Sequence, residues 1–210
     1  MEMEIDIGEV LRYMGSGKGD IKEEILSEVI SVCEMLKSSV SPQYVYRIFP
    51  ITVTKDTVQI DNISFASSRL AKHLKDCKKA AILAATLGIQ ADNAIRRSAI
   101  LGTVNASAAQ AAGTAIIEQV ADLATDAIEK ESRLKAIPRF SPGYADWHLS
   151  AQRDMLNLCD AQRRIGITLT DSLMMVPTKS VTAIIGLNNK GCTKKTNCSQ
   201  CDKKDCDYRL

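Results

Sequence analysis

The longest patterned segment of this sequence, residues 90–135, is rich in alanine. Alanine has the highest helix propensity, so the segment predicts a long helical region, and Gly102 predicts a break within it. Apolar side chains recur along the segment at helical spacing, at Ile116, Val120, Leu123, Ala127 and Leu134. A helical region of this length constrains the fold, because its apolar stripe needs another layer of structure to pack against.

Shorter segments supply that layer. Residues 44–53 and 57–60 are rich in β-branched and aromatic residues and flank a Lys55-Asp56 turn, which predicts a β-hairpin. Asp20 and either Ser67 or Ser68 are the expected N-caps of two further helices. We predict strands at residues 80–87, 167–170 and 181–187, and helices at residues 5–14, 20–37, 67–77 and 150–162. The predicted fold class is α+β, with long helices packed on a modest mixed or antiparallel sheet.

We expect one domain, residues 1–188, with a helical N-terminal part at residues 1–40. A tail follows at residues 189–210, with many charges and few apolar side chains. The net charge of +2 gives no reason to expect a nucleic acid or an acidic membrane as a partner. The sequence has no apolar run long enough to span a bilayer, and its first residues do not resemble a signal peptide. The expected location is therefore cytoplasmic.

The segment that joins the long helical region to the next helix is suited to holding a charged small molecule. Arg139 offers a forked pair of donors to a carboxylate. Pro142 and Gly143 predict a tight turn in which backbone groups can face a ligand. Tyr144 adds a ring and a hydroxyl group. From composition alone, a plain turn between two helices with a surface arginine is the alternative interpretation.

The sequence around this segment resembles the activation domain of cobalamin-dependent methionine synthase. The resemblance rests on Arg-x-x-Pro-Gly-Tyr at residues 139–144, on residues 166–177 (GITLTDSLMMVP) and on residues 180–186 (SVTAIIG). Residues 9–15, 85–88 and 118–122 are also similar to free-standing members of that family. No single motif is specific, but their order and spacing together span residues 5–187.

The resemblance implies a function and a ligand. In methionine synthase, the corrinoid is rescued after oxidation by one electron and a methyl group from S-adenosylmethionine, which the activation domain binds. It implies that Arg139 holds the ligand carboxylate and that Ser141, Pro142, Gly143 and Tyr144 contact the rest of the molecule. It also implies ligand contacts at Ile185 and Gly186 on the last strand, and at Asp6, which is the nearest match to an aspartate near the start of the family domain.

The expected role is that of an accessory reactivation subunit, since cobalamin, homocysteine and folate modules are absent from the sequence. The expected partner is a cobalamin-dependent methionine synthase, or a related corrinoid methyltransferase that lacks its own activation domain, with cobalamin supplied only by that partner. A reductant protein is a further expected partner. The rival hypothesis is a metal-binding electron-transfer, redox or interaction protein that docks on a corrinoid methyltransferase without using S-adenosylmethionine.

Four cysteines crowd into the tail, at Cys192, Cys198, Cys201 and Cys206. In a reducing compartment such a cluster predicts metal binding before disulfide bonding. Four thiolates can hold either zinc or an iron-sulfur cluster, and the spacing alone leaves the choice open. An iron-sulfur cluster is the attractive hypothesis, because reactivation of a corrinoid consumes an electron.

Overall fold

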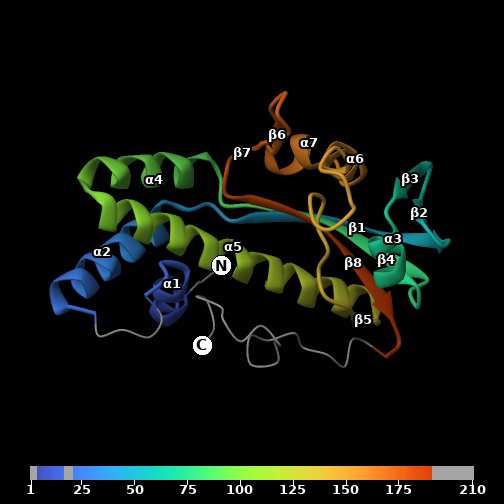
Figure 1. Ribbon diagram of the computed structural model, residues 1–210, viewed down its shortest axis with the longest axis horizontal. Coiled ribbons are helices and arrows are strands. Elements are labelled where there is room, and N and C mark those ends of the chain that lie inside the picture. Colours follow the sequence, from blue (N-terminus) through green and yellow to red (C-terminus); the bar gives the residue numbers. More distant parts are fainter. Residues whose placement is uncertain (1–3, 17–20, 191–210) are drawn as a thin grey trace.

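The computed structural model describes residues 4–16 and 21–190, which form an antiparallel sheet with helices on both faces (Figure 1). The main sheet has the strand order β3-β2-β1-β4-β8-β5. Its strands are β1 (Gln43–Val53), β2 (Thr57–Ile60), β3 (Ile63–Ala66), β4 (Lys79–Thr86), β5 (Lys135–Ala136) and β8 (Ser180–Asn188). Every pair of neighbouring strands is antiparallel, so the predicted α+β fold class is confirmed.

The middle of the sheet is β4, which is buried along seven of its eight residues. Ala81 and Leu83 face one side of the sheet, and Ala80 and Ile82 face the other. Small and aliphatic side chains on both faces allow helices to pack closely on each side. The short hairpin of β6 (Thr168–Leu169) and β7 (Met175–Val176) lies outside the main sheet.

One face of the sheet is covered by α5 (Thr103–Ser132), the longest described helix. Ala121, Ala124 and Ile128 of α5 pack on Ile185 and Leu187 of β8. The first half of α5 packs with the three other helices at that end of the molecule (Figure 1). These helices are α1 (Ile7–Tyr13), α2 (Glu23–Ser39) and α4 (Ile89–Leu101).

The opposite face carries the shorter helices and the loop of residues 137–150. Leu70 and Leu74 of α3 (Ser68–Leu74) and Met155 of α6 (Ala151–Leu158) pack with Ile82 of β4. Trp147 of the loop joins the same core, with its ring edge-on to Phe65 at 5.5 Å between centroids. The short helix α7 (Ala161–Ile165) completes this layer.

Most predicted elements are present with small shifts in their ends. The β1–β2 hairpin, the cap of α3 by Ser67 and the break at Gly102 all occur as predicted. The predicted helix at residues 150–162 is instead two helices, because Asp160 adopts a left-handed backbone conformation between α6 and α7. Asp20, the expected cap of α2, lies outside the described residues.

The apolar stripe predicted on the long helical region was partly wrong. Ile116 and Val120 are fully buried, but Leu123 is 41% exposed. The helix also ends at Ser132, because Arg133 takes the left-handed conformation and Lys135 begins a strand. Within residues 4–16 and 21–190, no helix is long and apolar enough to cross a membrane.

Candidate functional site

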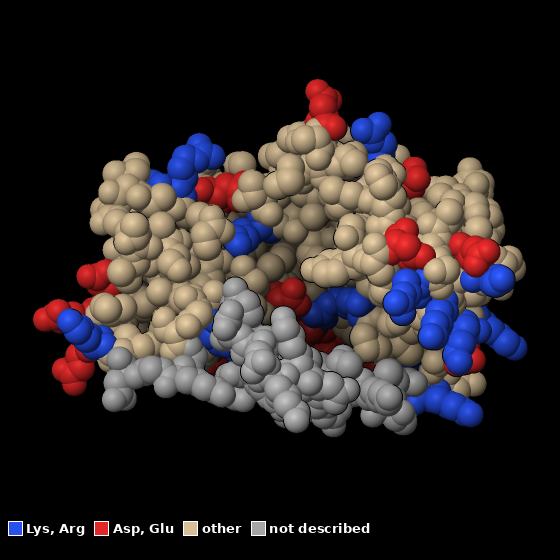
Figure 2. Space-filling model, in the orientation of Figure 1, with Lys and Arg blue, Asp and Glu red and all other residues tan. Residues whose placement is uncertain are grey.

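A cavity of about 1000 Å³ lies along the edge of β8, between α5 and the loop that follows β5. Strand β5 pairs only with Leu187 and Asn188, and Phe140 adds an isolated bridge to Ile184. The earlier part of β8, from Ser180 to Thr182, lines the cavity instead of pairing with a strand on this side. Figure 2 shows a hollow in the middle of this face of the molecule, where acidic and basic side chains meet.

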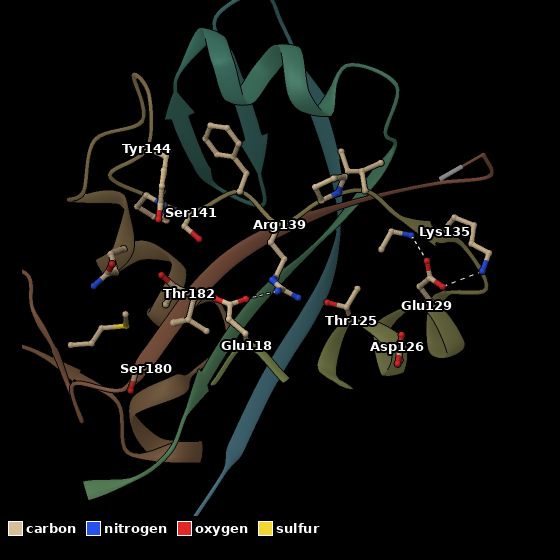
Figure 3. A pocket seen from close by; sticks show the side chains of 18 of the residues that line it. Glu118, Thr125, Asp126, Glu129, Lys135, Arg139, Ser141, Tyr144, Ser180 and Thr182 are labelled. Carbon is tan, nitrogen blue, oxygen red and sulfur yellow. Dashed lines mark hydrogen bonds and ion pairs between the residues drawn. The ribbon is translucent and has the colours of Figure 1, made fainter. Parts of the chain in front are cut away.

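Backbone hydrogen bonds to β8 fix the position of Arg139. The amide of Ile137 donates to the carbonyl of Gly186 at 2.9 Å, and Phe140 and Ile184 exchange two backbone hydrogen bonds of 3.0 and 2.8 Å. Side chains alternate along an extended segment, so Phe140 points into the core while Arg139 points the other way. The guanidinium group of Arg139 is thereby directed toward α5 (Figure 3).

The turn at residues 141–147 depends on Gly143. This residue has φ +88°, a conformation that glycine adopts without strain, and its amide donates to the carbonyl of Trp147 at 2.8 Å. The turn holds Ser141 and Pro142 at the cavity and leaves Tyr144 at its rim, where the residue is 70% exposed.

Asp146 ties this turn to α3. Its carboxylate accepts hydrogen bonds from the Ser67 hydroxyl, from the Ser68 amide and hydroxyl, and from the Arg69 amide. Hydrogen bonds from Ser67 and then Ser68 to the charged form hold the pKa of Asp146 well below its usual range. An acid at this position also satisfies amides at the N-terminus of a helix. The loop that carries Arg139 is therefore anchored to an element more than sixty residues away in sequence.

Arg139 forms ion pairs with two carboxylates of α5. Its Nη2 lies 2.6 Å from Glu118 Oε2, and its Nη1 lies 2.5 Å from Asp122 Oδ1. Burial acts to lower the pKa of Arg139, but the hydrogen bonds and charges of Asp122 and Glu118 outweigh it and raise the pKa. The guanidinium side chain is 25% exposed, so this charge cluster is screened only in part by water.

A second charged pair lies further along α5. Glu129 accepts hydrogen bonds from the Ala136 amide at 2.7 Å and from Lys135 Nζ at 3.1 Å. The hydrogen bond from Ala136 is the main cause of the lowered pKa of Glu129. Glu118, Asp126 and Glu129 line the cavity from the helix, and Lys135 and Arg139 line it from the loop side (Figure 3). The cavity thus presents acids on one wall and cations on the other.

Strand β8, which forms a third wall of the cavity, offers backbone hydrogen-bonding groups. Ile184 directs both its N–H and its C=O to the edge occupied by Phe140. Groups that point to the same edge recur at every second residue of a strand, so the backbone of Thr182 faces the cavity. A ligand lying along this edge can pair with that backbone as an additional strand would.

The structure brings together four of the eight predicted ligand contacts. Arg139, Ser141, Pro142 and Tyr144 line the cavity, whereas Gly143, Ile185, Gly186 and Asp6 are not among its lining residues. Gly143 shapes the turn behind the wall.

The other three predicted residues have clear structural environments. Ile185 is fully buried against α5, and a Cβ on Gly186 would lie 2.6 to 2.8 Å from Leu74, Cys77 and Ile137. Asp6 caps α1 by accepting a hydrogen bond from the Gly8 amide at 2.8 Å. These residues therefore shape the fold in this structure, and β8 contributes Ser180, Val181 and Thr182 to the wall instead.

Sequence reasoning missed the acidic side of α5. Glu118 and Asp122 stand four residues apart, and Asp126 and Glu129 follow at helical spacing, so all four project to one side of a helix. This periodicity was available in the sequence. What the sequence did not show is that Arg139 lies against this side of the helix.

The four cysteines of the tail lie outside the described residues. In the described part of the chain, no group of three or more His, Cys, Asp or Glu side chains is arranged to hold a metal ion. Cys33, Cys77 and Cys159 are buried, and burial is the first cause of the raised pKa of each thiol. Lys190, the last described residue of the chain, lines the cavity.

Comparison with known proteins defines the class of this fold. A solved structure titled "Crystal Structure of the MetH Reactivation Domain bound to AdoHcy" matches with a TM-score of 0.63 and 14% sequence identity. The match covers 92% of this chain and 80% of that one. The chain therefore has the fold of a methionine synthase reactivation domain.

The sequence comparison points to the same family. Residues 117–209 match the family model described as the vitamin B12 dependent methionine synthase activation domain. The resemblance predicted from the sequence is thus confirmed. The matched region begins at Ile117 and contains Glu118, Asp122 and the loop that carries Arg139. None of the curated proteins compared with this sequence matches it.

Proposed function

We propose that this protein binds S-adenosylmethionine and supports the reductive methylation of a corrinoid in a cobalamin-dependent methionine synthase. The observation that carries the proposal is the position of Arg139. It lies in the cavity of a reactivation-domain fold, opposite the acids of α5. The related structure was solved with AdoHcy, the thioether that remains when S-adenosylmethionine gives up its methyl group.

The residues of the cavity fit the chemistry of this ligand. Its methionine part carries a carboxylate and an ammonium group, and its sulfur is positively charged. Arg139 is suited to the carboxylate, and Glu118 to a neighbouring cation. The Thr182 backbone and Ser141 supply hydrogen-bonding groups of the kind that an adenosine requires, and the volume of about 1000 Å³ is ample for a molecule of this size.

The chain contributes positioning rather than proton transfer. Bound S-adenosylmethionine supplies an electrophilic methyl group, and the attacking corrinoid comes from the partner enzyme. In-line displacement at a methyl group requires alignment more than an acid or base. The rim residue Tyr144 is exposed at the mouth, where the corrinoid-carrying module must approach.

Titration calorimetry tests the ligand. The wild-type chain should bind S-adenosylmethionine, and Arg139→Ala should weaken binding about ten- to a hundredfold, the cost of losing a hydrogen-bonded charge partner. Arg163→Ala is the matched control, because Arg163 of α7 pairs with the preceding Asp160, outside the cavity. Failure of the wild type to bind would contradict the proposal.

A reconstitution experiment tests the role. The protein is added to a methionine synthase that lacks its activation domain, and conversion of cob(II)alamin to methylcobalamin is followed with and without a reductant. Conversion that requires this protein and S-adenosylmethionine is the expected result. Tight ligand binding without any conversion would support ligand binding but contradict the reactivation role.

A second proposal concerns the tail of residues 189–210, which we treat as a metal-binding unit separate from the domain of residues 1–188. Its support is the four cysteines, Cys192, Cys198, Cys201 and Cys206, together with the position of Lys190 at the cavity wall. Cysteine-rich sequences of this kind bind zinc or iron-sulfur clusters in reducing compartments, which fits a cytoplasmic location. An iron-sulfur cluster held by these cysteines would supply the electron that reductive methylation of the corrinoid consumes.

Metal analysis of anaerobically purified protein separates the alternatives. Iron and sulfide in equal amounts, with a visible absorption band, are expected for a cluster. Colourless protein that contains zinc would contradict the electron-transfer role and leave a structural one. Protein with neither metal would contradict the second proposal while leaving the first intact.

A further inference from the structure

In the structure, the carboxylate-binding group of the cavity is already paired. Arg139 holds Glu118 at 2.6 Å and Asp122 at 2.5 Å. Two negative charges so close to one guanidinium oppose the approach of a third carboxylate. A ligand carboxylate that takes Arg139 must therefore replace one of these two side chains, or bind against the repulsion of both.

The two acids differ in their surroundings. Glu118 lines the cavity and its side chain is 46% exposed, whereas Asp122 does not line the cavity and is 69% exposed. The more exposed carboxylate loses less by giving up its partner, because water solvates it when it is released. Release of Asp122 from Arg139 therefore costs less than release of Glu118, and it leaves Glu118 in the cavity with its negative charge.

We propose that Asp122 is an internal competitor that occupies the carboxylate-binding side of Arg139 until a ligand carboxylate displaces it. The inference rests on the proposed function, since it concerns the same cavity. The ligand carboxylate replaces Asp122 on Arg139, while Glu118 stays in place to meet the ligand ammonium group. The exchange favours a ligand that carries both a carboxylate and an ammonium group. A ligand with a carboxylate alone must bind beside the negative charge of Glu118 with no ammonium group to offset it.

Three ligands with an uncharged sulfur separate the contributions of the carboxyl and amino groups to binding. They are S-adenosylhomocysteine, its analogue without the amino group, and its analogue without the carboxyl group. For Asp122→Asn, both carboxylate-bearing ligands should bind about two- to fivefold more tightly, the factor that corresponds to an exposed ion pair. The ligand without a carboxyl group should bind as it does to the wild type. Calorimetry measures all three.

Asp171→Asn is the matched control. Asp171 is exposed near the β6–β7 turn and does not line the cavity, and the substitution removes the same charge. This substitution should not raise the affinity for the carboxylate-bearing ligands relative to the affinity for the ligand without a carboxyl group. Asp122→Ala serves as a second variant, since alanine is favourable in a helix and Asp122 is exposed.

Several results would overturn the role of Asp122. These are unchanged affinity in both Asp122 variants, weaker binding of the carboxylate-bearing ligands, or equal tightening of all three ligands. In each of these cases the wild type still binds S-adenosylhomocysteine, so the proposed function survives. Failure of the wild type and both variants to bind S-adenosylhomocysteine would overturn the proposed function and this inference together.

Discussion

At the scale of single residues, the site depends on side chains that act on one another across long stretches of sequence. Asp146 caps α3 and anchors the loop, and Glu118 and Asp122 hold the guanidinium group of Arg139. The resemblance singled out Arg139 because its motif is local. Its partners lie on another element, and only the packing of loop against helix reveals them.

The anchor at Asp146 predicts a pH dependence. The pKa of this carboxyl is lowered in the folded state, so its stabilising effect is fully present above the unfolded-state pKa of about 3.9. The effect is lost as pH falls from there toward the lower folded-state pKa. Trp147, the only tryptophan, adjoins Asp146 and reports on the loop by its fluorescence.

Asp146→Asn should therefore loosen the loop at neutral pH and remove part of the acid sensitivity of the wild type. The measurement is Trp147 fluorescence together with unfolding by urea at pH values from 7 down to about 3. Asp171→Asn, an exposed acid near the β6–β7 turn, is the control. Equal pH dependence in wild type and Asp146→Asn would contradict the anchoring role.

At the scale of elements, local pattern predicted most helices and strands. The alanine-rich segment is α4 and α5, and the apolar run at residues 80–87 is β4. The predictions fail where tertiary contacts determine which residues are buried and where short strands form. Leu123 is apolar but exposed, because the side of α5 that faces the sheet is set by Ala121, Ala124 and Ile128. β7 and β5, each two residues long, are too short to give a periodic signal.

The junction between α4 and α5 gives an element-scale prediction. Gly102 has φ +145° and ψ +170°, a conformation essentially restricted to glycine, although a Cβ there would have room. Gly102→Ala should lower the free energy of unfolding by about 1–3 kcal/mol through backbone strain alone. Urea unfolding measures the change, with Ala99→Ser at an exposed position of α4 as the control. A stability equal to the wild type would show that the junction relaxes to a conformation that alanine accepts.

At the scale of the whole molecule, the cavity exists because the edge strand of the sheet is much shorter than the strand beside it. Strand β5 is short, so β8 keeps an open edge from Ser180 to Thr182, and α5 and the loop of residues 137–144 wall it on either side. The site is thus built from a helix, a loop and a strand, and its lining residues Glu118, Arg139 and Thr182 lie tens of residues apart in sequence.

The described cores also predict the effect of removing the tail. Their members all lie between Ile5 and Leu187. A chain that ends at Lys190 should therefore keep the free energy of unfolding and the affinity for S-adenosylhomocysteine of the full chain, and lose only the metal that we propose for the tail. The full-length chain with all four tail cysteines changed to serine is the control. Loss of cooperative unfolding on truncation would contradict the proposed boundary at residue 188.

The sequence by itself determined the identity of most elements and the resemblance of the Arg139 loop to an activation domain, because helix propensity, alternation and turn chemistry act over a few residues. Only the tertiary structure decided that Arg139 pairs with Glu118 and Asp122, and that β8 presents Thr182 rather than Ile185 to the cavity. Strand pairing and helix packing fix those relations, since they set which side of each element faces the others.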